Sequence, residues 1–140
     1  MQLTEHFSVE EMTATQTRID NTPPQEVMSS LRIVAESMEI VRGALGDRPI
    51  HVNSGYRSPE VNTAVGGSKT SAHMQGFACD FICPKFGTPI EVCEAIVAAG
   101  IRFDQLIEEG TWVHISFARP MRQEVLTKRG PGYTPGLSER

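Results

Sequence analysis

Residues 25–45 carry apolar side chains at intervals of three and four, the spacing that places them on one face of a helix. These positions are Val27, Leu31, Val34, Met38, Val41 and Leu45. A helix cannot bury such a face by itself, so the rest of the chain must pack against it. A chain of 140 residues is long enough for one hydrophobic core and too short for two. The sequence therefore predicts a single domain built around this helix.

Cap and alternation patterns place the other elements. Capping boxes or a proline at the first turn predict helices over 9–14, 59–65 and 89–99. Strands are predicted over 50–54, 78–83, 104–109 and 111–117, the last two joined in a hairpin at Glu109 and Gly110. The expected fold class is α+β, with a small antiparallel sheet flanked by helices. Residues 1–127 are expected to form the domain, and residues 128–140, rich in proline and glycine, a flexible tail.

Charge and hydropathy exclude several classes of partner. The net charge of −4 argues against nucleic acid, because phosphate binding needs a basic face. The chain contains no apolar run near the ~20 residues of a membrane span, so we expect no membrane insertion. The N-terminus has neither the basic start nor the apolar stretch of a secretory signal. We therefore expect the protein to be made in the cytoplasm and to need another route to any target outside.

Three residues distant in sequence are candidate metal ligands. His73 lies in a glycine-rich loop, Asp80 follows it in a predicted strand, and His114 lies in a later strand. Two imidazoles and one carboxylate form a ligand set that leaves a fourth zinc position open for water. Spacing alone does not decide the matter, because a strand histidine is often only packed in the core.

Three motifs resemble one family of enzymes. Residues 71–80 read Ser-Ala-His-Met-Gln-Gly-Phe-Ala-Cys-Asp, residues 54–58 read Ser-Gly-Tyr-Arg-Ser, and residues 112–114 read Trp-Val-His. Together they resemble the Ser-x-His-x-x-Gly-x-Ala-x-Asp signature, the Ser-Gly-Tyr-Arg-Ser element and the third-ligand strand of zinc D-Ala-D-Ala peptidases and murein endopeptidases. The opening segment and residues 65–68 also resemble the phage and prophage branch of that family.

The resemblance implies a hedgehog-like fold and Zn²⁺ bound by His73, Asp80 and His114. It also implies that Arg57 polarises the substrate carbonyl, although a structural ion pair would explain this arginine as well. Ser71, Tyr56 and Trp112 are the residues we expect to contact substrate. For Ser71 the alternative is bracing of the loop before His73, and for Trp112 a half-buried core position.

The catalytic glutamate is the point where this sequence departs from many relatives. They carry glutamate three residues before the last histidine, where this chain has Thr111. Glu108 and Glu109 are the two candidates for the general base. If the hairpin loop comprises residues 109–111, Glu108 pairs with Trp112 and shares the sheet face of His114. On that register we expect Glu108 rather than Glu109 to be the base.

The expected function is hydrolysis of peptidoglycan stem peptides, as a D-Ala carboxypeptidase or as an endopeptidase at the L-Ala–D-Glu bond. We expect a monomeric phage or prophage endolysin that reaches the cell wall through phage-assisted release or from the virion. Two alternatives stay open. One is a non-catalytic, zinc-stabilised wall-binding or virion module, favoured by Thr111 at the glutamate position. The other is a zinc peptidase acting on a free dipeptide in the cytoplasm.

Overall fold

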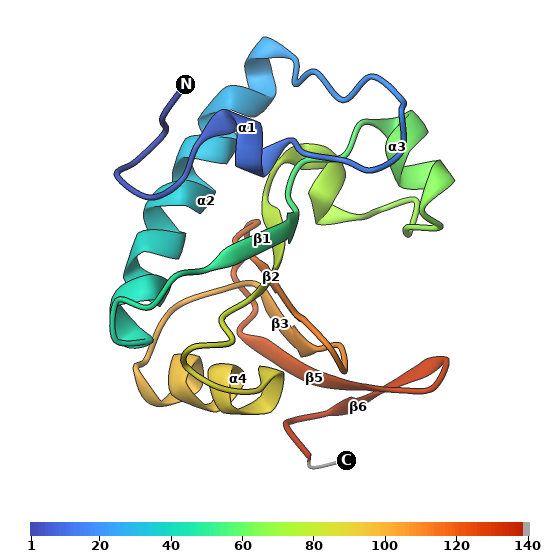
Figure 1. Ribbon diagram of the computed structural model, residues 1–140. Helices are drawn as coiled ribbons and strands as arrows, with labels where there is room; N and C mark the ends of the chain where they lie inside the picture. Colours follow the sequence, from blue (N-terminus) through green and yellow to red (C-terminus); the bar gives the residue numbers. More distant parts are fainter. Residues whose placement is uncertain (139–140) are drawn as a thin grey trace.

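The computed structural model describes residues 1–138 and shows helices packed against a six-stranded sheet (Figure 1). The helices are α1 (Val9–Met12), α2 (Gln25–Ala44), α3 (Pro59–Ala64), the short 3-10 helix η1 (Ala72–Gln75) and α4 (Pro89–Ala98). The strands are β1 (His51–Ser54), β2 (Ala78–Ile82), β3 (Gln105–Glu108), β4 (Val113–Ser116), β5 (Glu124–Arg129) and β6 (Gly132–Pro135). The expected α+β class is confirmed.

The helices begin where the sequence predicts. Ser8 caps α1 and Thr88 caps α4, each with the reciprocal glutamate of a capping box, and Ser58 caps α3. These caps satisfy backbone N–H groups that the first turn of a helix leaves unpaired. The apolar face of α2 is buried along its whole length, as its spacing predicts. Among the described residues, no helix combines the length and apolar character needed to cross a bilayer.

The sheet is mixed and has the strand order β1-β2-β4-β3-β5-β6. Its pairs are antiparallel except for β3 and β5, which run parallel. The expected small antiparallel sheet therefore also contains one parallel pair. The physical reason is the short connection formed by residues 117–123. Because β4 ends beside the start of β3, this connection carries the chain across that end of the sheet, and β5 begins next to the start of β3. There Gln123 N–H bonds to the Phe103 carbonyl at 3.0 Å, and β5 enters alongside β3 in the same direction.

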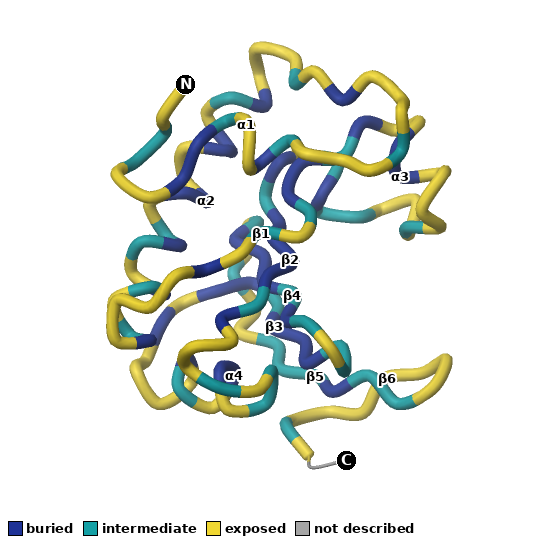
Figure 2. The backbone as a smooth tube through the Cα atoms, in the orientation of Figure 1, coloured by how far each residue is buried: buried dark blue, intermediate teal, exposed yellow. Residues whose placement is uncertain are grey.

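The hydrophobic core lies between one face of the sheet and helices α2 and α4. Cys79, Phe81, Leu106 and Ile115 from the central strands join the side chains of both helices in one buried cluster. Figure 2 shows the central strands as the most buried part of the sheet and β6 as exposed. The opposite face of the central strands is therefore available for a functional site.

The C-terminal segment differs from the sequence expectation. The expected boundary between domain and flexible tail, at residue 128, falls inside β5, and residues 128–135 belong to the β5–β6 hairpin. The glycines and prolines there make a tight turn and an edge strand. Thr127 is fully buried, and its hydroxyl donates to the Gly136 carbonyl at 2.7 Å. Residues 139–140, the last of the expected tail, lie outside the described residues.

Candidate metal centre

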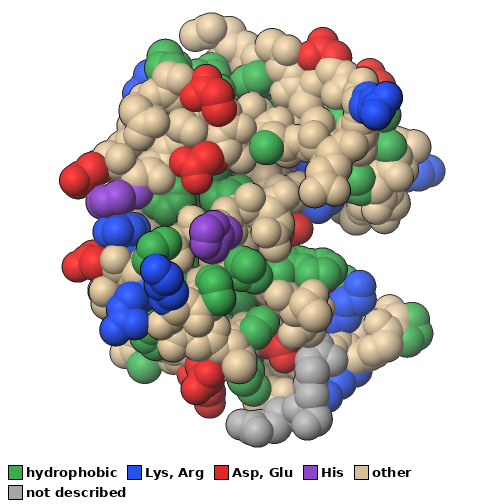
Figure 3. Space-filling model, viewed as in Figure 1, with side chains coloured by type: hydrophobic (Ala, Val, Ile, Leu, Met, Phe, Trp, Pro, Cys, Tyr) green, Lys and Arg blue, Asp and Glu red, His purple; other side chains and the backbone are tan. Residues whose placement is uncertain are grey.

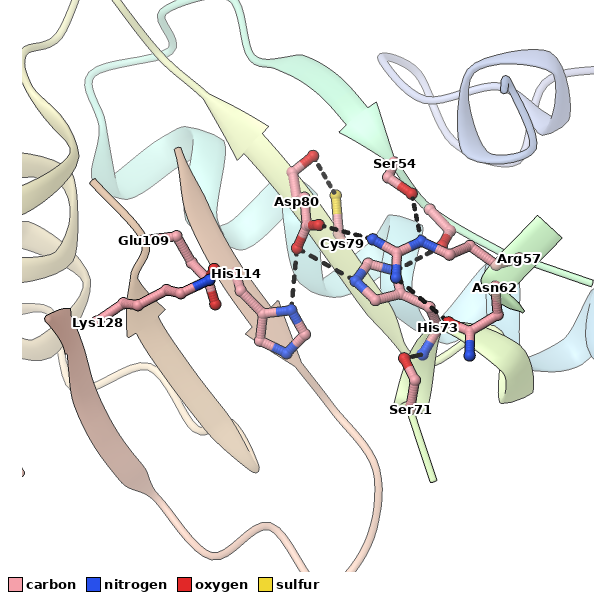
Figure 4. A network of polar contacts seen from close by, with 11 residues as sticks. Ser54, Arg57, Asn62, Ser71, His73, Cys79, Asp80, Glu109, His114 and Lys128 are labelled. Carbon is pink, nitrogen blue, oxygen red and sulfur yellow. Dashed lines mark hydrogen bonds and ion pairs between the residues drawn. The ribbon is translucent and has the colours of Figure 1, made fainter. Parts of the chain in front are cut away.

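Three side chains converge on the open face of the sheet (Figure 4). His73 comes from η1, Asp80 from β2 and His114 from β4, and their candidate ligand atoms all lie within 4.8 Å of one another. Asp80 Oδ1 lies 3.2 Å from His73 Nε2 and 2.9 Å from His114 Nδ1. His73 and Asp80 are buried, and His114 is partly exposed. The three predicted ligands therefore meet at one point, although they are up to 41 residues apart in sequence (114 − 73).

Local structure explains how these residues reach that point. Asp80 and His114 are direct partners across β2 and β4, so their side chains leave the same face of the sheet. The Ser71 hydroxyl caps η1 by accepting from His73 N–H at 3.2 Å. Gly76 ends η1 with a φ of 76°, a left-handed conformation that glycine adopts without steric cost. The short helix thus delivers His73 beside the start of β2.

The backbone around Gly55 orients His73. The Gly55 carbonyl accepts a 2.7 Å hydrogen bond from His73 Nδ1, the outer contact that commonly fixes a ligand imidazole. Tyr56 N–H bonds to the Met12 carbonyl at 2.7 Å, which brings the two backbones together. A Cβ on Gly55 would lie 2.3 Å from that carbonyl oxygen. Gly55 belongs to the Ser-Gly-Tyr-Arg-Ser motif, but its orienting role could not be predicted from the sequence.

Arg57 lies beside the cluster and is held by several partners. Its guanidinium contacts Asp80 Oδ2 at 3.2 Å, Ser54 Oγ at 3.0 Å and Asn62 Oδ1 at 3.4 Å. The structural ion pair considered from sequence is therefore present, and Arg57 also lines the cleft described below. Asn62 is 3% exposed and also donates to the Ser68 carbonyl. No motif in the sequence singled it out.

The environment keeps Asp80 ionised. Burial alone raises the pKa of Asp80, but hydrogen bonds from His114 and His73 outweigh it and hold that pKa well below its ordinary value. A carboxylate that stays deprotonated is the form that binds a cation. Together with two imidazole nitrogens it provides a set of donors that suits a divalent transition metal with one position left open.

The two glutamates take opposite faces of the sheet. Glu109 N–H bonds to the Trp112 carbonyl at 3.0 Å, and Glu108 pairs with Val113. The turn therefore comprises Gly110 and Thr111 only, one residue fewer than the loop on which the choice of Glu108 rested. Glu109 consequently lines the cleft with His114.

Glu108 lies on the core side of the sheet. It is 2% exposed, and its carboxylate accepts from Gly110 N–H. The predicted position of Glu108 beside the metal ligands is wrong, because a shift of one residue in register exchanges the faces of a strand. Burial raises the pKa of Glu109, and Asp80 adds to this, although His114 acts against it. Glu109 is thus the one of the two glutamates that lines the cleft.

The three residues expected to contact substrate separate into two groups. Ser71 and Trp112 line the cleft, and Ser71 also braces the loop before His73, the alternative considered from sequence. Tyr56 is 4% exposed and packs in the hydrophobic core. Its predicted contact with substrate is therefore not supported, because its ring is buried and does not line the cleft.

The cluster opens into a cleft of about 620 Å³. Figure 3 shows the molecule hollowed between the part that carries α1 and α3 and the part that carries the β5–β6 hairpin. One wall includes the loop over residues 66–72, and the other includes Gln105, Ile107, Leu126 and Tyr133. The arrangement can hold a metal ion and expose its open position to an extended ligand.

Comparisons with known proteins show similarity to peptidases. Residues 5–116 match the family model described as peptidase M15. A stretch of 43 residues, 31% of the chain, is 49% identical to a zinc D-Ala-D-Ala carboxypeptidase of Streptomyces albus G. The match covers 17% of that relative, so the chain spans less than a fifth of its length. The family match contains all three candidate ligands, Arg57 and both glutamates.

Proposed function

This chain belongs to the peptidase M15 family, and on that premise we propose that it is a zinc-dependent peptidase that hydrolyses stem peptides of bacterial peptidoglycan. The observation that carries the proposal is the convergence of His73, Asp80 and His114 at the floor of a cleft also lined by Glu109 and Arg57. Zinc is supported by these donors, and by the zinc carboxypeptidase to which part of the chain is similar.

In the proposed mechanism His73, Asp80 and His114 hold the metal. Bound there, zinc supplies Lewis acidity toward the substrate carbonyl and lowers the pKa of water. Glu109 accepts the proton of the attacking water and returns it to the leaving nitrogen. Its raised pKa suits both steps, because a base that is too weak cannot take the proton.

Arg57 is proposed to stabilise the oxygen of the substrate carbonyl. Negative charge develops on that oxygen as the bond is attacked, and a fixed cation stabilises it without reorganisation. The contacts with Ser54 and Asn62 hold the guanidinium in place, so little side-chain entropy remains to be lost on binding.

The substrate is proposed to be a stem peptide cut at a bond involving D-alanine or at the L-Ala–D-Glu bond. The non-catalytic module considered as an alternative rested on Thr111 at the glutamate position. Glu109 provides a carboxylate in the cleft without a glutamate at that position, so this alternative loses the observation that favoured it.

The test is mass spectrometry of defined muropeptides after incubation with zinc-loaded and with chelated protein. We expect one new pair of products with the zinc-loaded protein and none after chelation. Free D-Ala-D-Ala, tested in parallel, separates wall hydrolysis from hydrolysis of a cytoplasmic dipeptide. Unchanged muropeptides at full zinc occupancy would contradict the proposal.

We further propose that the protein acts as a phage or prophage lysin. The support is the resemblance of its opening segment and of residues 65–68 to that branch. Expressed alone in the cytoplasm it is expected to leave cells intact, and co-expressed with a membrane pore-forming protein it is expected to lyse them. Lysis at the same rate without the pore would contradict this route to the wall.

A further inference from the structure

The open face of the sheet continues beyond the metal ligands onto the β5–β6 hairpin. Strand register pairs Asp80 with His114, His114 with Ile107, Ile107 with Leu126, and Leu126 with Pro135. Paired residues of neighbouring strands point to the same face. These five side chains therefore form one continuous row from the metal centre to the edge of the sheet.

A second row lies beside the first and contains the proposed base. Glu109 is next to Trp112, Lys128 Nζ lies 4.0 Å from Glu109 Oε2, and Lys128 pairs with Tyr133. Tyr133 is 50% exposed, yet it lines the same cleft as His73 and His114. The hairpin is therefore one wall of the cleft that holds the metal ligands.

The two ends of this cleft differ in chemistry. Imidazoles, carboxylates and Arg57 gather at the metal centre, whereas the apolar side chains of Ile107, Leu126 and Tyr133 follow along the row toward the hairpin. Gln105 and Arg122 also line the cleft. Figure 3 shows hydrophobic side chains along the wall of the hollow on the hairpin side. A half-exposed tyrosine and a half-buried leucine form a surface that gains free energy when an alkyl group covers them.

The dimensions suit a side chain or a short peptide segment. Strands in a sheet are about 4.8 Å apart, so β5 lies about 10 Å and β6 about 14 Å from β4 across the row. Consecutive residues of a peptide are only about 4 Å apart, so the two residues that flank a peptide bond held beside His114 end short of β5. A residue further along the peptide, through a long side chain, reaches Leu126 and Tyr133. The matched family region ends at residue 116, so the hairpin lies outside it.

We propose that the β5–β6 hairpin is the specificity wall of the cleft, where Leu126 and Tyr133 bind the alkyl side chain of a stem-peptide residue beyond the two that flank the bond that is cut. The inference rests on the proposed function and adds to it the residues that select the substrate. It follows that affinity depends on an alkyl side chain in the substrate, and that a minimal dipeptide does not reach the hairpin.

The test measures binding, so that it does not depend on turnover. Trp112 lines the cleft and is the only tryptophan in the chain, so its fluorescence reports on occupancy. In zinc-loaded protein carrying Glu109→Gln, which keeps the peptide intact, Tyr133→Ala is expected to weaken muropeptide binding about tenfold. Tyr133→Phe retains the ring and is expected to bind as tightly as the parent. Phe86→Ala, at a partly exposed aromatic residue outside the cleft lining, is the matched control and should change nothing.

Each outcome decides between the two proposals. If the parent binds muropeptide and Tyr133→Ala binds it equally well, the hairpin is not the specificity wall, and the proposed function is unaffected. If the zinc-loaded wild-type protein does not cut muropeptides and the Glu109→Gln parent does not bind them, the proposed function fails and the inference fails with it. An equal loss of affinity for D-Ala-D-Ala in Tyr133→Ala would also overturn the inference, because the dipeptide is too short to reach the hairpin.

Discussion

At the level of single residues, the chemistry of the cleft depends on which carboxylate faces it. Glu108 and Glu109 are neighbours, yet the first is packed on the core side of the sheet and the second lines the cleft. The two-residue turn at Gly110 and Thr111 causes this difference, because it sets the register between β3 and β4. The pair therefore offers its own control for a test of general-base catalysis.

Glu109→Gln is expected to lower muropeptide hydrolysis by about 10²–10⁴-fold, because an amide cannot accept the proton of water. Zinc stoichiometry should stay unchanged, since Glu109 is not among the three candidate ligands. Glu108→Gln has the same change in charge on the opposite face and should retain hydrolysis within a few-fold of the parent. Steady-state rates with both variants check this, and an equal loss in Glu108→Gln would contradict the assignment.

At the level of elements, the opening segment and the crossing between β4 and β5 position the site. α1 and the segment after β1 meet through the backbones of Met12, Gly55 and Tyr56. At the other end, Asp104 accepts from the backbone N–H, Nε and Nη2 of Arg122 at 2.9 to 3.0 Å. Each contact fixes a segment that carries no metal ligand but determines where the ligands or the cleft wall lie.

Gly55→Ala is expected to lower the free energy of unfolding by about 1–3 kcal/mol, because the new Cβ collides with the Met12 carbonyl and forces α1 away. Zinc affinity should also fall, since the Gly55 carbonyl orients His73. Gly43→Ala is the control. Nothing lies within 4 Å of a Cβ at that position in α2, so it should stabilise the protein by about 0.5–1 kcal/mol. Denaturant titration and zinc titration measure both effects.

Asp104→Asn is expected to lower the free energy of unfolding at pH 7 by about 1–2 kcal/mol, a modest value because the Arg122 side chain is half exposed. Hydrogen bonds from Arg122 hold the pKa of Asp104 below its ordinary 3.8. A lowered pKa stabilises the fold above the unfolded value and loses that effect as pH falls through the folded value. The difference between parent and variant should therefore shrink below about pH 4, as measured by denaturant titration across pH. A difference that stays constant with pH would contradict the ionic contribution.

The sequence predicted those elements whose signals are local. Ser8, Ser58 and Thr88 predict where helices begin, and the spacing of apolar residues predicts the buried face of α2. These predictions agree with the structure. The side of the sheet taken by Glu108 depends on one residue of turn length, which the sequence pattern does not fix. The hairpin over 124–135 was missed because β5 pairs in parallel with β3, a contact between distant segments that leaves no periodic pattern near Pro131 and Gly132.

At the level of the whole molecule, the candidate metal centre joins a short helix on one side of the cleft to two strands of the sheet. η1 belongs to the part above the cleft, whereas β2 and β4 belong to the sheet below it. The metal-bound form is therefore expected to be more stable than the metal-free form, because an ion that binds only the folded state shifts the equilibrium toward it.

Removal of zinc by a chelator is expected to lower Tm by about 14 °C, which corresponds to roughly 4 kcal/mol at a free zinc concentration 1,000 times Kd. Re-addition of zinc should restore the original Tm. His114→Ala removes one of the three candidate ligands, and its Tm should change little on chelation or on addition of zinc. Differential scanning calorimetry checks this, and a chelator-dependent shift of equal size in that variant would contradict the ligand assignment.

The central place of β4 in the sheet also determines when the site can exist during folding. β4 lies between β2 and β3 and brings His114 to its partner Asp80 only after the intervening residues 83–112, which include α4, have folded back onto the sheet. Contacts between such distant segments form late, because closing the loop between them costs chain entropy. A nascent or partly unfolded chain brings at most His73 and Asp80 together as ligands. The ion therefore stabilises the completed fold and does not initiate its formation.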